Sequence, residues 1–310
     1  MVQVGRGRKP TARRPPAHVD VCCATRPLAR PRLAMLKSFD GGRLFGASYG
    51  GDGTPWLLAL HGWARTHQDW RAVLGARDAG TVPQGSSPAT RPSRIGDPSV
   101  DESGGLDAMA SVALDLPGFG ATPPPPEAWG SAEYAAAVAP VLAELEVPTV
   151  VVGHSFGGRV AVHLAAAQPG LVKALVLTGV PLVRQAAGSR RPPLRYRVGR
   201  ALYGRGLVGE DRMETLRQRY GSPDYRAATG VMRQVLVRTV NETYDDQLRA
   251  LRCPVELVWG DDDTEVPVSV AETAARLLAR PNLTVCRGAG HLVPLTAPDA
   301  LRQVIERHRP

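Results

Sequence analysis

One stretch of the sequence decides the fold class: Val150-Val151-Val152-Gly153-His154-Ser155-Phe156-Gly157-Gly158. An apolar, β-branched run ends here in the pattern G-x-S-x-G, and residues 159–167 continue as an amphipathic helix. A strand that turns abruptly into a helix in this way raises the serine on a strained bend. Small residues are needed at Gly153 and Gly157, because a side chain at either position would collide across the sharp turn. The stretch therefore predicts that Ser155 is a nucleophile at the carboxyl end of a buried strand.

Short apolar runs alternate with longer amphipathic segments on both sides of this stretch, which is typical of a parallel sheet covered by helices. The runs are apolar enough to be central strands that are buried on both faces. The predicted strands are Trp56–Leu60, Ser111–Leu114, Thr149–Val152, Ala174–Leu177, Val255–Trp259 and Leu283–Cys286. A weaker pair, Leu36–Phe39 and Arg43–Tyr49, is joined by a turn at Asp40-Gly41-Gly42. The sequence predicts an α/β fold with a mostly parallel, eight-stranded sheet flanked by helices.

The positive charge of the chain is concentrated in its first residues. The formal net charge is +9, but residues 1–34 hold eight basic side chains and one acid, Asp20, which gives +7 for this segment. The remaining 276 residues therefore carry only +2. Residues 1–34 are rich in Pro, Arg and Ala and lack apolar periodicity, so they are predicted to form a disordered basic tail. The nearly neutral body argues against a nucleic-acid partner.

Several classes of protein are excluded by what the sequence lacks. It contains no run of about 18 apolar residues, the length that a membrane-spanning helix requires. Its four cysteines, Cys22, Cys23, Cys253 and Cys286, have neither the spacing of a disulfide framework nor that of a zinc site. No apolar segment follows Arg13-Arg14, so an export signal is not expected. We expect a cytoplasmic protein that needs no metal, no organic cofactor and no membrane partner.

Two segments interrupt the alternation of strands and helices. Residues 77–105 are dense in Gly, Pro, Ser and Asp, so they are predicted to form a mobile surface insertion. Residues 182–250 lack strand signals and lie between two predicted strands, which predicts a helical cap. The predicted cap helices are Leu194–Tyr203, Glu210–Tyr220, Ala227–Val237 and Tyr244–Leu251. Residues 35–181 and 251–310 form the two parts of the predicted core.

The predicted cap is rich in arginine, with six between residues 190 and 205. Two interpretations stay open. The guanidinium groups could bind an anionic substrate through paired hydrogen bonds, or they could form a solvated basic face. The sequence does not identify the substrate.

Five motifs, taken in order, resemble those of the α/β-hydrolase fold superfamily, in the single-domain group with a helical cap. The motifs are Leu60-His61-Gly62-Trp63, Leu114–Gly120, Gly153–Gly157, Trp259–Asp263 and Gly288–His291. The resemblance extends over about residues 36–308, apart from the insertion. In this superfamily the catalytic groups follow the chain order serine, acid, histidine. The resemblance implies a serine hydrolase with Ser155 as nucleophile, Asp263 as acid and His291 as base.

The base and the acid are chosen by position. His291 follows the last predicted strand, which places an imidazole with a pKa near neutrality at the carboxyl edge of the sheet. In related sequences the acid lies three residues after a glycine and four before a proline, a spacing that Asp263 satisfies. Asp262 is the second choice. His154, at the tip of the turn, is expected to pack in the core and not to act as the base.

Acyl transfer creates an oxyanion, which backbone N–H groups stabilise. One donor is expected on Phe156, directly after the nucleophile, and the second on Trp63, after His61-Gly62. His61 resembles the histidine that stabilises this loop in the superfamily. Asp115 and the Gly118-Phe119-Gly120 turn are expected to be scaffold residues and not catalytic ones.

The sequence predicts a serine hydrolase that cleaves a small ester-like or related carbonyl substrate through an acyl-enzyme. Two alternatives stay open. One is hydrolysis of a carbon–carbon bond in a ring-cleavage product by the same triad. Relatives with that activity usually carry extra glycines where this chain has Trp63-Ala64-Arg65. The other is a non-catalytic ligand-binding protein on the same fold. The sequence leaves the oligomeric state open.

Overall fold

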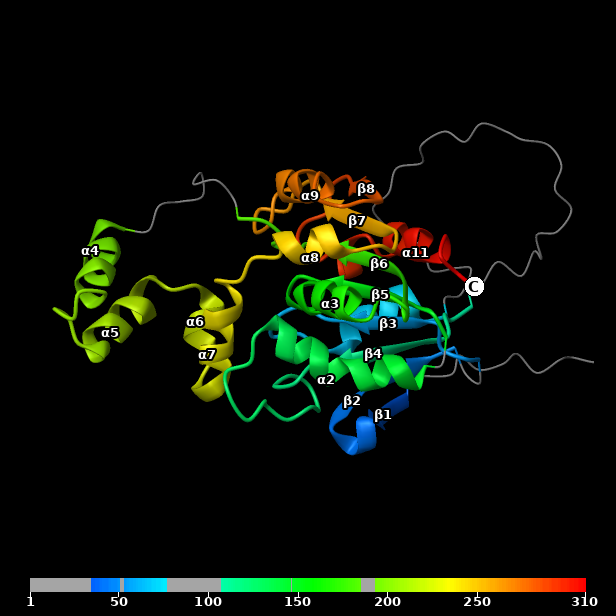
Figure 1. Cartoon of the computed structure of the whole chain (residues 1–310), viewed down its shortest axis with the longest axis horizontal. Helices are drawn as coiled ribbons and strands as arrows, with labels where there is room; N and C mark the ends of the chain where they lie inside the picture. Colours follow the sequence, from blue (N-terminus) through cyan, green and yellow to red (C-terminus); the bar gives the residue numbers. More distant parts are fainter. Residues whose placement is uncertain (1–34, 51–52, 77–106, 146, 185–192) are drawn as a thin grey trace, which may run out of the picture. The chain divides into compact units, whose positions relative to one another are not determined.

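The computed structural model describes residues 35–50, 53–76, 107–145, 147–184 and 193–310. The predicted tail at residues 1–34 and the predicted insertion at residues 77–105 lie outside the described residues. The described chain forms a sheet of eight strands, ordered β1-β2-β4-β3-β5-β6-β7-β8, with helices on both faces (Figure 1). This arrangement confirms the predicted α/β fold and its sheet.

The sheet is parallel except at one side. Its strands are β1 (Met35–Phe39), β2 (Leu44–Tyr49), β3 (Leu57–Leu60), β4 (Ser111–Asp115), β5 (Thr149–His154), β6 (Val172–Thr178), β7 (Val255–Gly260) and β8 (Pro281–Cys286). β2 pairs antiparallel with both β1 and β4, and all other neighbours are parallel. A 3₁₀ turn at Asp40–Gly42 joins β1 to β2. Because parallel strands share one carboxyl edge, the loops that follow β3 to β8 emerge together, as ligand-binding loops do in α/β proteins.

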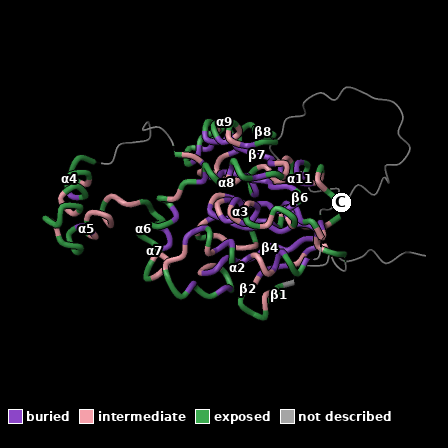
Figure 2. Tube along the Cα trace, in the orientation of Figure 1, coloured by how far each residue is buried: buried purple, intermediate pink, exposed green. Residues whose placement is uncertain are grey.

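Helices cover both faces of the sheet. They are η2 (His67–Trp70), α1 (Arg71–Leu74), α2 (Ser131–Glu144), α3 (Phe156–Ala167), α9 (Val268–Ala275), α10 (Val293–Thr296) and α11 (Pro298–Glu306). One face packs against α2, α3 and α9 through residues such as Tyr134 and Val160. The other face packs against α1, α10 and α11 through residues such as Leu74 and Leu301. The strands β2 to β7 and the helix α3 are buried along most of their length (Figure 2).

The outermost strand differs from its prediction. The sequence predicts that residues 283–286 belong to a central strand buried on both faces, and this is wrong. β8 is an edge strand, with β7 as its neighbour in the described sheet, and Val285 is 44% exposed. The apolar run predicts the strand correctly. The sequence pattern does not contain the order of the strands in the sheet, and this order decides which strand lies at the solvent-exposed edge.

The segment between β6 and β7 holds five helices in the described chain: α4 (Leu194–Tyr203), α5 (Glu210–Tyr220), α6 (Pro223–Ala227), α7 (Gly230–Thr239) and α8 (Asp245–Ala250). The helix predicted near Ala227–Val237 corresponds to α7, which begins three residues later than predicted, because Ala228 is extended, with ψ 139°. The short helix α6 before it was not predicted. Ser222 caps the start of α6, where its side chain accepts the N–H of Tyr225 at 3.1 Å. α8 packs on α3, and its Leu248 joins the main core. None of the described helices combines the length and the apolar character that crossing a membrane requires.

Candidate active site

The turn that carries Ser155 joins β5 to α3 at the carboxyl edge of the sheet. Ser155 has backbone angles of φ 47° and ψ −110°, a region that non-glycine residues rarely adopt. Holding a residue in such a conformation costs about 1–3 kcal/mol, so the surrounding structure must enforce it. The backbone N–H of Ser155 donates to the carbonyl of Thr178, at the end of β6, over 2.9 Å. The strained turn predicted from the sequence is confirmed.

Two glycines allow this turn to pack closely against neighbouring backbone. A Cβ at Gly153 would lie 2.5 Å from the Cα of Gly158, and a Cβ at Gly157 would lie 2.5 Å from the carbonyl oxygen of His61. Both partners are backbone atoms, which cannot move aside as a flexible side chain could. The Gly157 N–H donates to the same His61 carbonyl over 2.9 Å. The missing side chains therefore bring the start of α3 directly against the loop after β3.

His291 and Asp263 meet from the loops that follow β8 and β7. His291 Nδ1 donates to Asp263 Oδ2 over 2.8 Å, because an ionised carboxylate can only accept. The second oxygen, Oδ1, accepts the backbone N–H groups of Glu265 over 2.9 Å and Val266 over 2.8 Å. Asp263 is buried, whereas Asp262 is exposed and makes no recorded contact with His291 in the described chain. This geometry leaves Nε2 of His291 as the nitrogen that can accept a proton.

Carboxylates raise the pKa of His291 above the ordinary histidine value. Burial acts to lower this pKa, but the hydrogen bond that His291 donates to Asp263 and the charges of Asp263, Glu265 and Asp224 outweigh burial. Glu265 Oε2 lies 3.7 Å from His291 Nε2, on a side chain that is 70% exposed. Asp224 belongs to α6 in the inserted helices. Sequence reasoning missed Glu265 and Asp224, because no motif spacing indicates that they reach the histidine.

The structure brings His291 to the neighbourhood of Ser155. A Cβ at Gly179, one residue past the carbonyl that holds Ser155, would lie 2.9 Å from His291 Cε1 and 3.2 Å from His154 Cε1. The ring centroids of His154 and His291 are 4.9 Å apart. No hydrogen bond joins the Ser155 hydroxyl to His291 in the described part of the chain. The bond between His291 and Asp263 is thus formed, while the serine and the imidazole are neighbours without a direct bond.

His154 is a buried, neutral histidine. Its Nδ1 lies 3.1 Å from the carbonyl oxygen of Thr178, so this nitrogen carries the proton. Burial, followed by the charge of His291, lowers the pKa of His154 to about 3. His154 therefore stays uncharged near neutral pH and packs beside the imidazole of His291, as the sequence predicts.

The two expected oxyanion donors, Phe156 and Trp63, lie on segments that touch each other. Phe156 opens α3, and Trp63 follows His61 in the loop after β3. His61 fixes this loop, because its Nε2 accepts the N–H of Leu116 over 2.9 Å. Burial lowers the pKa of His61 to about 4, which keeps that nitrogen unprotonated. No acceptor is recorded for the backbone N–H of Phe156 or Trp63 among the described residues, so both groups are available to an oxyanion.

Aromatic rings form an apolar wall beside these donors. Trp63 lies edge-to-face against Phe119 at 5.0 Å and against Phe156 at 5.4 Å between ring centroids. Met232 of α7 reaches the same place, since a Cβ at Gly118 would lie 2.5 Å from the Met232 Cε. Trp63 and Met232 are half-buried. The inserted helices therefore contribute a side chain to the apolar surroundings of the site.

Asp115 holds the loop that carries Phe119. Its side chain accepts the backbone N–H of His67 over 2.8 Å and that of Ala121 over 3.0 Å. Gly120 has φ +55°, and a Cβ there would lie 2.6 Å from Asp115 Oδ1. The Asp115 carboxylate thus links the backbone at His67 to the backbone at Ala121, which agrees with the scaffold role expected for Asp115.

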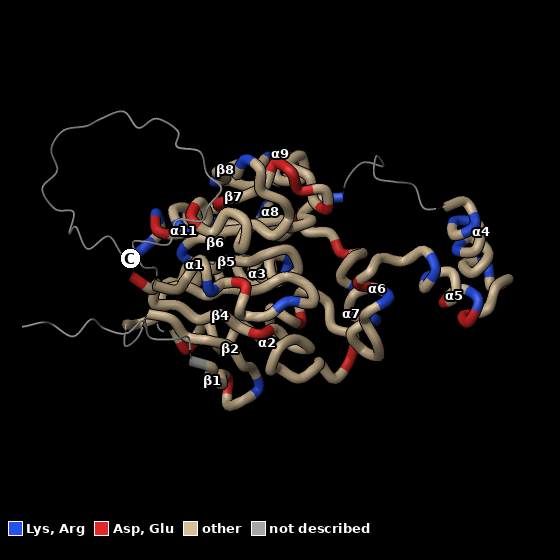
Figure 3. The backbone as a smooth tube through the Cα atoms, turned by 180° about the vertical axis from the view of Figure 1, so that it is seen from behind, with Lys and Arg blue, Asp and Glu red and all other residues tan. Residues whose placement is uncertain are grey.

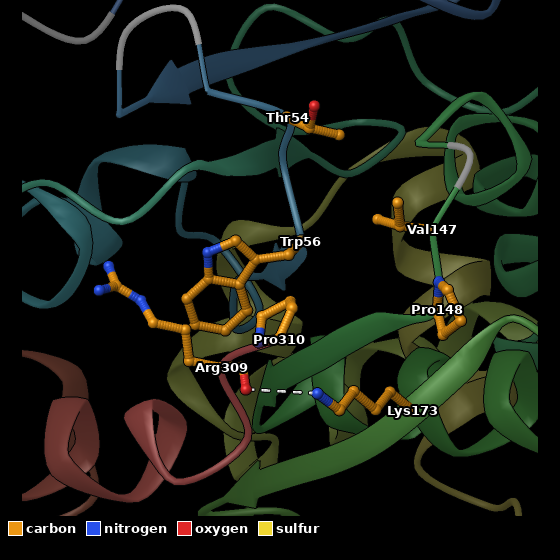
Figure 4. Close-up of a pocket in the computed structure, with 7 residues that line it drawn as sticks. All are labelled: Thr54, Trp56, Val147, Pro148, Lys173, Arg309 and Pro310. Atoms are coloured by element: carbon orange, nitrogen blue, oxygen red, sulfur yellow. Dashed lines mark hydrogen bonds between the residues drawn. The ribbon is translucent and has the colours of Figure 1, made fainter.

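A cavity of about 610 Å³ lies at the opposite end of the strands from Ser155 (Figure 4). It is lined by Thr54, Trp56, Val147, Pro148, Lys173, Arg309 and Pro310. Most of these residues precede or begin β3, β5 and β6, whereas Ser155 follows β5. Lys173 Nζ donates to the Arg309 carbonyl over 3.4 Å, beside the indole of Trp56. This cavity is separate from the candidate active site. The described residues contain no group of three or more His, Cys, Asp or Glu side chains that could hold a metal ion.

Known proteins are similar to this chain in sequence or in fold. An uncharacterized protein of Mycobacterium tuberculosis is 28% identical over 275 residues, which cover 77% of this chain and 80% of the relative. The pimeloyl-[acyl-carrier protein] methyl ester esterase of Aromatoleum aromaticum is 27% identical over 279 residues, which cover 81% of this chain and 97% of that protein. The solved structure of a thermophilic esterase from Thermogutta terrifontis is similar in fold, with a TM-score of 0.54 and 20% identity over 90% of this chain and 97% of that one.

A family model supplies the assignment. The model described as "Alpha/beta hydrolase family" matches residues 57–304, which is most of the chain and includes every residue of the candidate site. The strands β3 to β8, the turn at Ser155 and the loops after β7 and β8 all fall inside this match. This protein belongs to the alpha/beta hydrolase family.

Proposed function

We propose that this hydrolase cleaves a small ester-like substrate through an acyl-enzyme. Ser155 is the nucleophile, His291 is the general base, and Asp263 orients and stabilises the imidazole. The N–H groups of Phe156 and Trp63 form the oxyanion hole. The observation that carries the proposal is the strained turn of Ser155 beside the His291–Asp263 pair, whose Nδ1–Oδ2 distance is 2.8 Å. A raised hydroxyl next to an oriented imidazole is what acyl transfer by serine requires.

The first half of the reaction forms the acyl-enzyme. His291 Nε2 takes the proton of Ser155 Oγ as this oxygen attacks the carbonyl carbon of the substrate. The carbonyl oxygen becomes an oxyanion, which the N–H groups of Phe156 and Trp63 stabilise. His291 then gives its proton to the leaving alkoxide, the carbon–oxygen bond breaks and the alcohol departs. Asp263 stays ionised throughout and stabilises the imidazolium.

The second half returns the enzyme to its starting state. A water molecule gives a proton to His291 Nε2 and attacks the acyl carbon, and the same donors stabilise the second oxyanion. The bond to Ser155 Oγ breaks, the acid product leaves and His291 returns the proton to the serine oxygen. No metal or organic cofactor enters this cycle.

Two observations support an ester as the substrate. A protein similar over most of this chain is named a methyl ester esterase, and a similar fold is that of an esterase. The wall of Trp63, Phe119 and Met232 favours a substrate with an apolar group beside the carbonyl. We further propose that residues 182–250 act as a cap over the site, which the contact of Met232 with Gly118 supports.

The proposal also includes the setting of the enzyme: a small-molecule substrate, no nucleic-acid partner and a reducing, cytoplasmic compartment. Cys253 and Cys286 are free thiols, which is the usual state of cysteines in such a compartment.

Labelling with a fluorophosphonate probe, followed by peptide mapping, tests the nucleophile. We expect the probe on Ser155, and we expect the Ser155→Ala variant to lose both labelling and hydrolysis of p-nitrophenyl butyrate. Ser269→Ala, a change at an exposed serine on α9, is the matched control and should leave both unchanged. Label on a different serine, or full turnover by Ser155→Ala, would refute the assignment.

The carbon–carbon alternative is distinguished by its substrate. A ring-cleavage dienoate that is turned over with a kcat/KM far above that of simple esters would replace the ester proposal while keeping the same triad. Membership of a hydrolase family speaks against the non-catalytic alternative.

A further inference from the structure

One face of α4 and the loop behind it expose large apolar side chains. Leu194 is 70% exposed, Val198 is 49% exposed and Leu207, four residues past the end of α4, is 70% exposed. Leu194 and Val198 are four residues apart, so they lie one above the other on the same side of the helix. Single exposed aliphatic residues are ordinary, but three within one short segment need an explanation.

The opposite face of α4 already has a partner. A Cβ at Gly199 would collide with the side chain of Leu216, which shows how closely α4 approaches α5. The rings of Tyr196 and Tyr220 are 6.4 Å apart between centroids. The side of α4 that carries Leu194 and Val198 is therefore not the side that packs on α5.

Arginine is the only charged residue type in this segment. Residues 193–209 contain Arg195, Arg197, Arg200 and Arg205 and no Asp or Glu, which gives a net charge of +4. The four arginines are exposed, and the structure records no ion pair for Arg195, Arg197 or Arg200 in the described part of the chain. Figure 3 shows this concentration of basic residues on α4. Apolar side chains flanked by unpaired arginines define a basic amphipathic helix.

We propose that the exposed face of α4, with Leu207, docks this protein on membranes that contain anionic phospholipids. Leu194, Val198 and Leu207 enter the boundary between headgroups and acyl chains. The arginine stems lie along the apolar surface while the guanidinium groups reach the lipid phosphates. The expectation of no membrane partner was drawn from the lack of a spanning segment, and a helix that lies on the surface needs none.

Charge complementarity favours an anionic membrane over two other partners for this face of α4, a second copy of the chain and an acidic protein. A second copy of the chain would bring four more arginines against the same face, which like-charge repulsion disfavours. An acidic protein would pair with the arginines, but it would need its own apolar groups to cover the exposed aliphatic side chains. An anionic bilayer offers phosphates and hydrocarbon together.

Vesicle binding by the full chain tests the proposal. We expect co-sedimentation with phosphatidylglycerol vesicles and much weaker binding to phosphatidylcholine vesicles. Each basic residue near an anionic surface strengthens binding about fivefold, so the triple variant R195Q/R197Q/R200Q should bind roughly 100-fold more weakly. The double variant L194S/V198S keeps every charge and should still bind about tenfold more weakly, because it removes apolar burial.

Matched variants elsewhere control for charge and hydrophobicity. R252Q/R276Q/R280Q removes the same number of charges from exposed positions after α8 and α9. V237S/V240S removes two aliphatic side chains that are 43% and 57% exposed. Both should bind phosphatidylglycerol vesicles within about threefold of the parent, since an effect of net charge alone is weak beyond a Debye length. Equal losses in test and control variants would overturn the proposal.

Hydrogen exchange on the vesicles locates the contact. Protection of residues 194–207 supports the proposal, and protection confined to the basic residues 1–34 overturns it. Absence of vesicle binding overturns it as well, as does a change of elution volume in L194S/V198S that assigns the face to a second copy. Loss of binding in an excess of inorganic phosphate at constant ionic strength would assign the arginines to a free anion. Vesicle co-sedimentation and hydrogen exchange are measured without any substrate, so their outcome is independent of the proposed function.

Discussion

Ser155 and its neighbours are held by buried backbone contacts, whereas α4 and α5 hold each other by a few side chains and leave apolar groups exposed. The N–H of Ser155 donates to the carbonyl of Thr178 at the end of β6, and the N–H of Gly157 donates to the carbonyl of His61 directly after β3. Asp263 is fixed by two N–H groups of its own loop. The outer face of α4 has no such contacts among the described residues. The catalytic groups, which need sub-ångström placement, thus lie on the rigid sheet edge. The helices α4 and α5, which make few contacts, form the region that can change its sequence more freely.

The largest expected effect lies at the rigid edge. Asp263→Asn should leave the hydrogen bond geometry near His291 intact but lower kcat by about 10⁴-fold, because the imidazole loses its carboxylate partner and its tautomer. Asp262→Asn is the control and should change kcat by less than about threefold, since Asp262 is exposed. Steady-state hydrolysis of p-nitrophenyl butyrate measures both. Equal losses in the two variants would remove Asp263 from its assigned role.

A second change tests whether the turn is held as tightly as its contacts indicate. Gly157→Ala places a Cβ 2.5 Å from the His61 carbonyl oxygen and should lower the free energy of unfolding by about 1–3 kcal/mol through overpacking. Gly170→Ala is the matched control, because a Cβ there meets nothing within 4 Å. Urea unfolding compares the two variants. A Gly157→Ala protein as stable as the control would show that the turn can relax.

A third change concerns the contact between α3, directly after Ser155, and the inserted helix α7. Arg159 of α3 donates to the Thr239 carbonyl at the end of α7 and to the Tyr244 hydroxyl over 3.3 Å. Arg159→Met should lower the free energy of unfolding by about 1–2 kcal/mol, because it breaks hydrogen bonds to a charged donor. Hydrogen exchange should accelerate in residues 230–244 and not in β5. Arg249→Met, at an exposed arginine on α8, should have no such effect.

The smallest effect is expected from the exposed carboxylate beside His291. Glu265 raises the pKa of His291, and catalysis needs neutral Nε2, so activity rises as pH increases through that pKa. Glu265→Gln removes the negative charge and should move the acid limb of the kcat/KM profile to lower pH. The gain at acidic pH should stay below about fivefold, because an exposed charge is screened by water. An unmoved acid limb, equal to that of the exposed control Glu272→Gln, would contradict this role.

Local patterns carried most of the fold. The apolar runs predict β3 to β7 to within a few residues, because a strand that is buried on both faces must be apolar. The weaker pair β1 and β2 and the edge strand β8 were also predicted to within a few residues. The glycines at positions 153 and 157 reveal the turn at Ser155, because the backbone there tolerates no side chain. Boundaries failed where a local signal was overlooked, as at Ser222, whose side chain starts α6.

Residue patterns along the chain predict the sheet, the strained serine turn and the motif order that points to Ser155, Asp263 and His291. The tertiary structure decided what no spacing encodes: that β8 is an edge strand, that Asp263 and not Asp262 reaches His291, and that Glu265 and Asp224 add their charges beside it. This difference arises because some interactions act between residues that are close in sequence, and others act between residues that are far apart in sequence. Steric and hydrophobic requirements act on neighbours along the chain and leave a readable pattern. Hydrogen bonds and charges between distant loops depend on where folding has placed them.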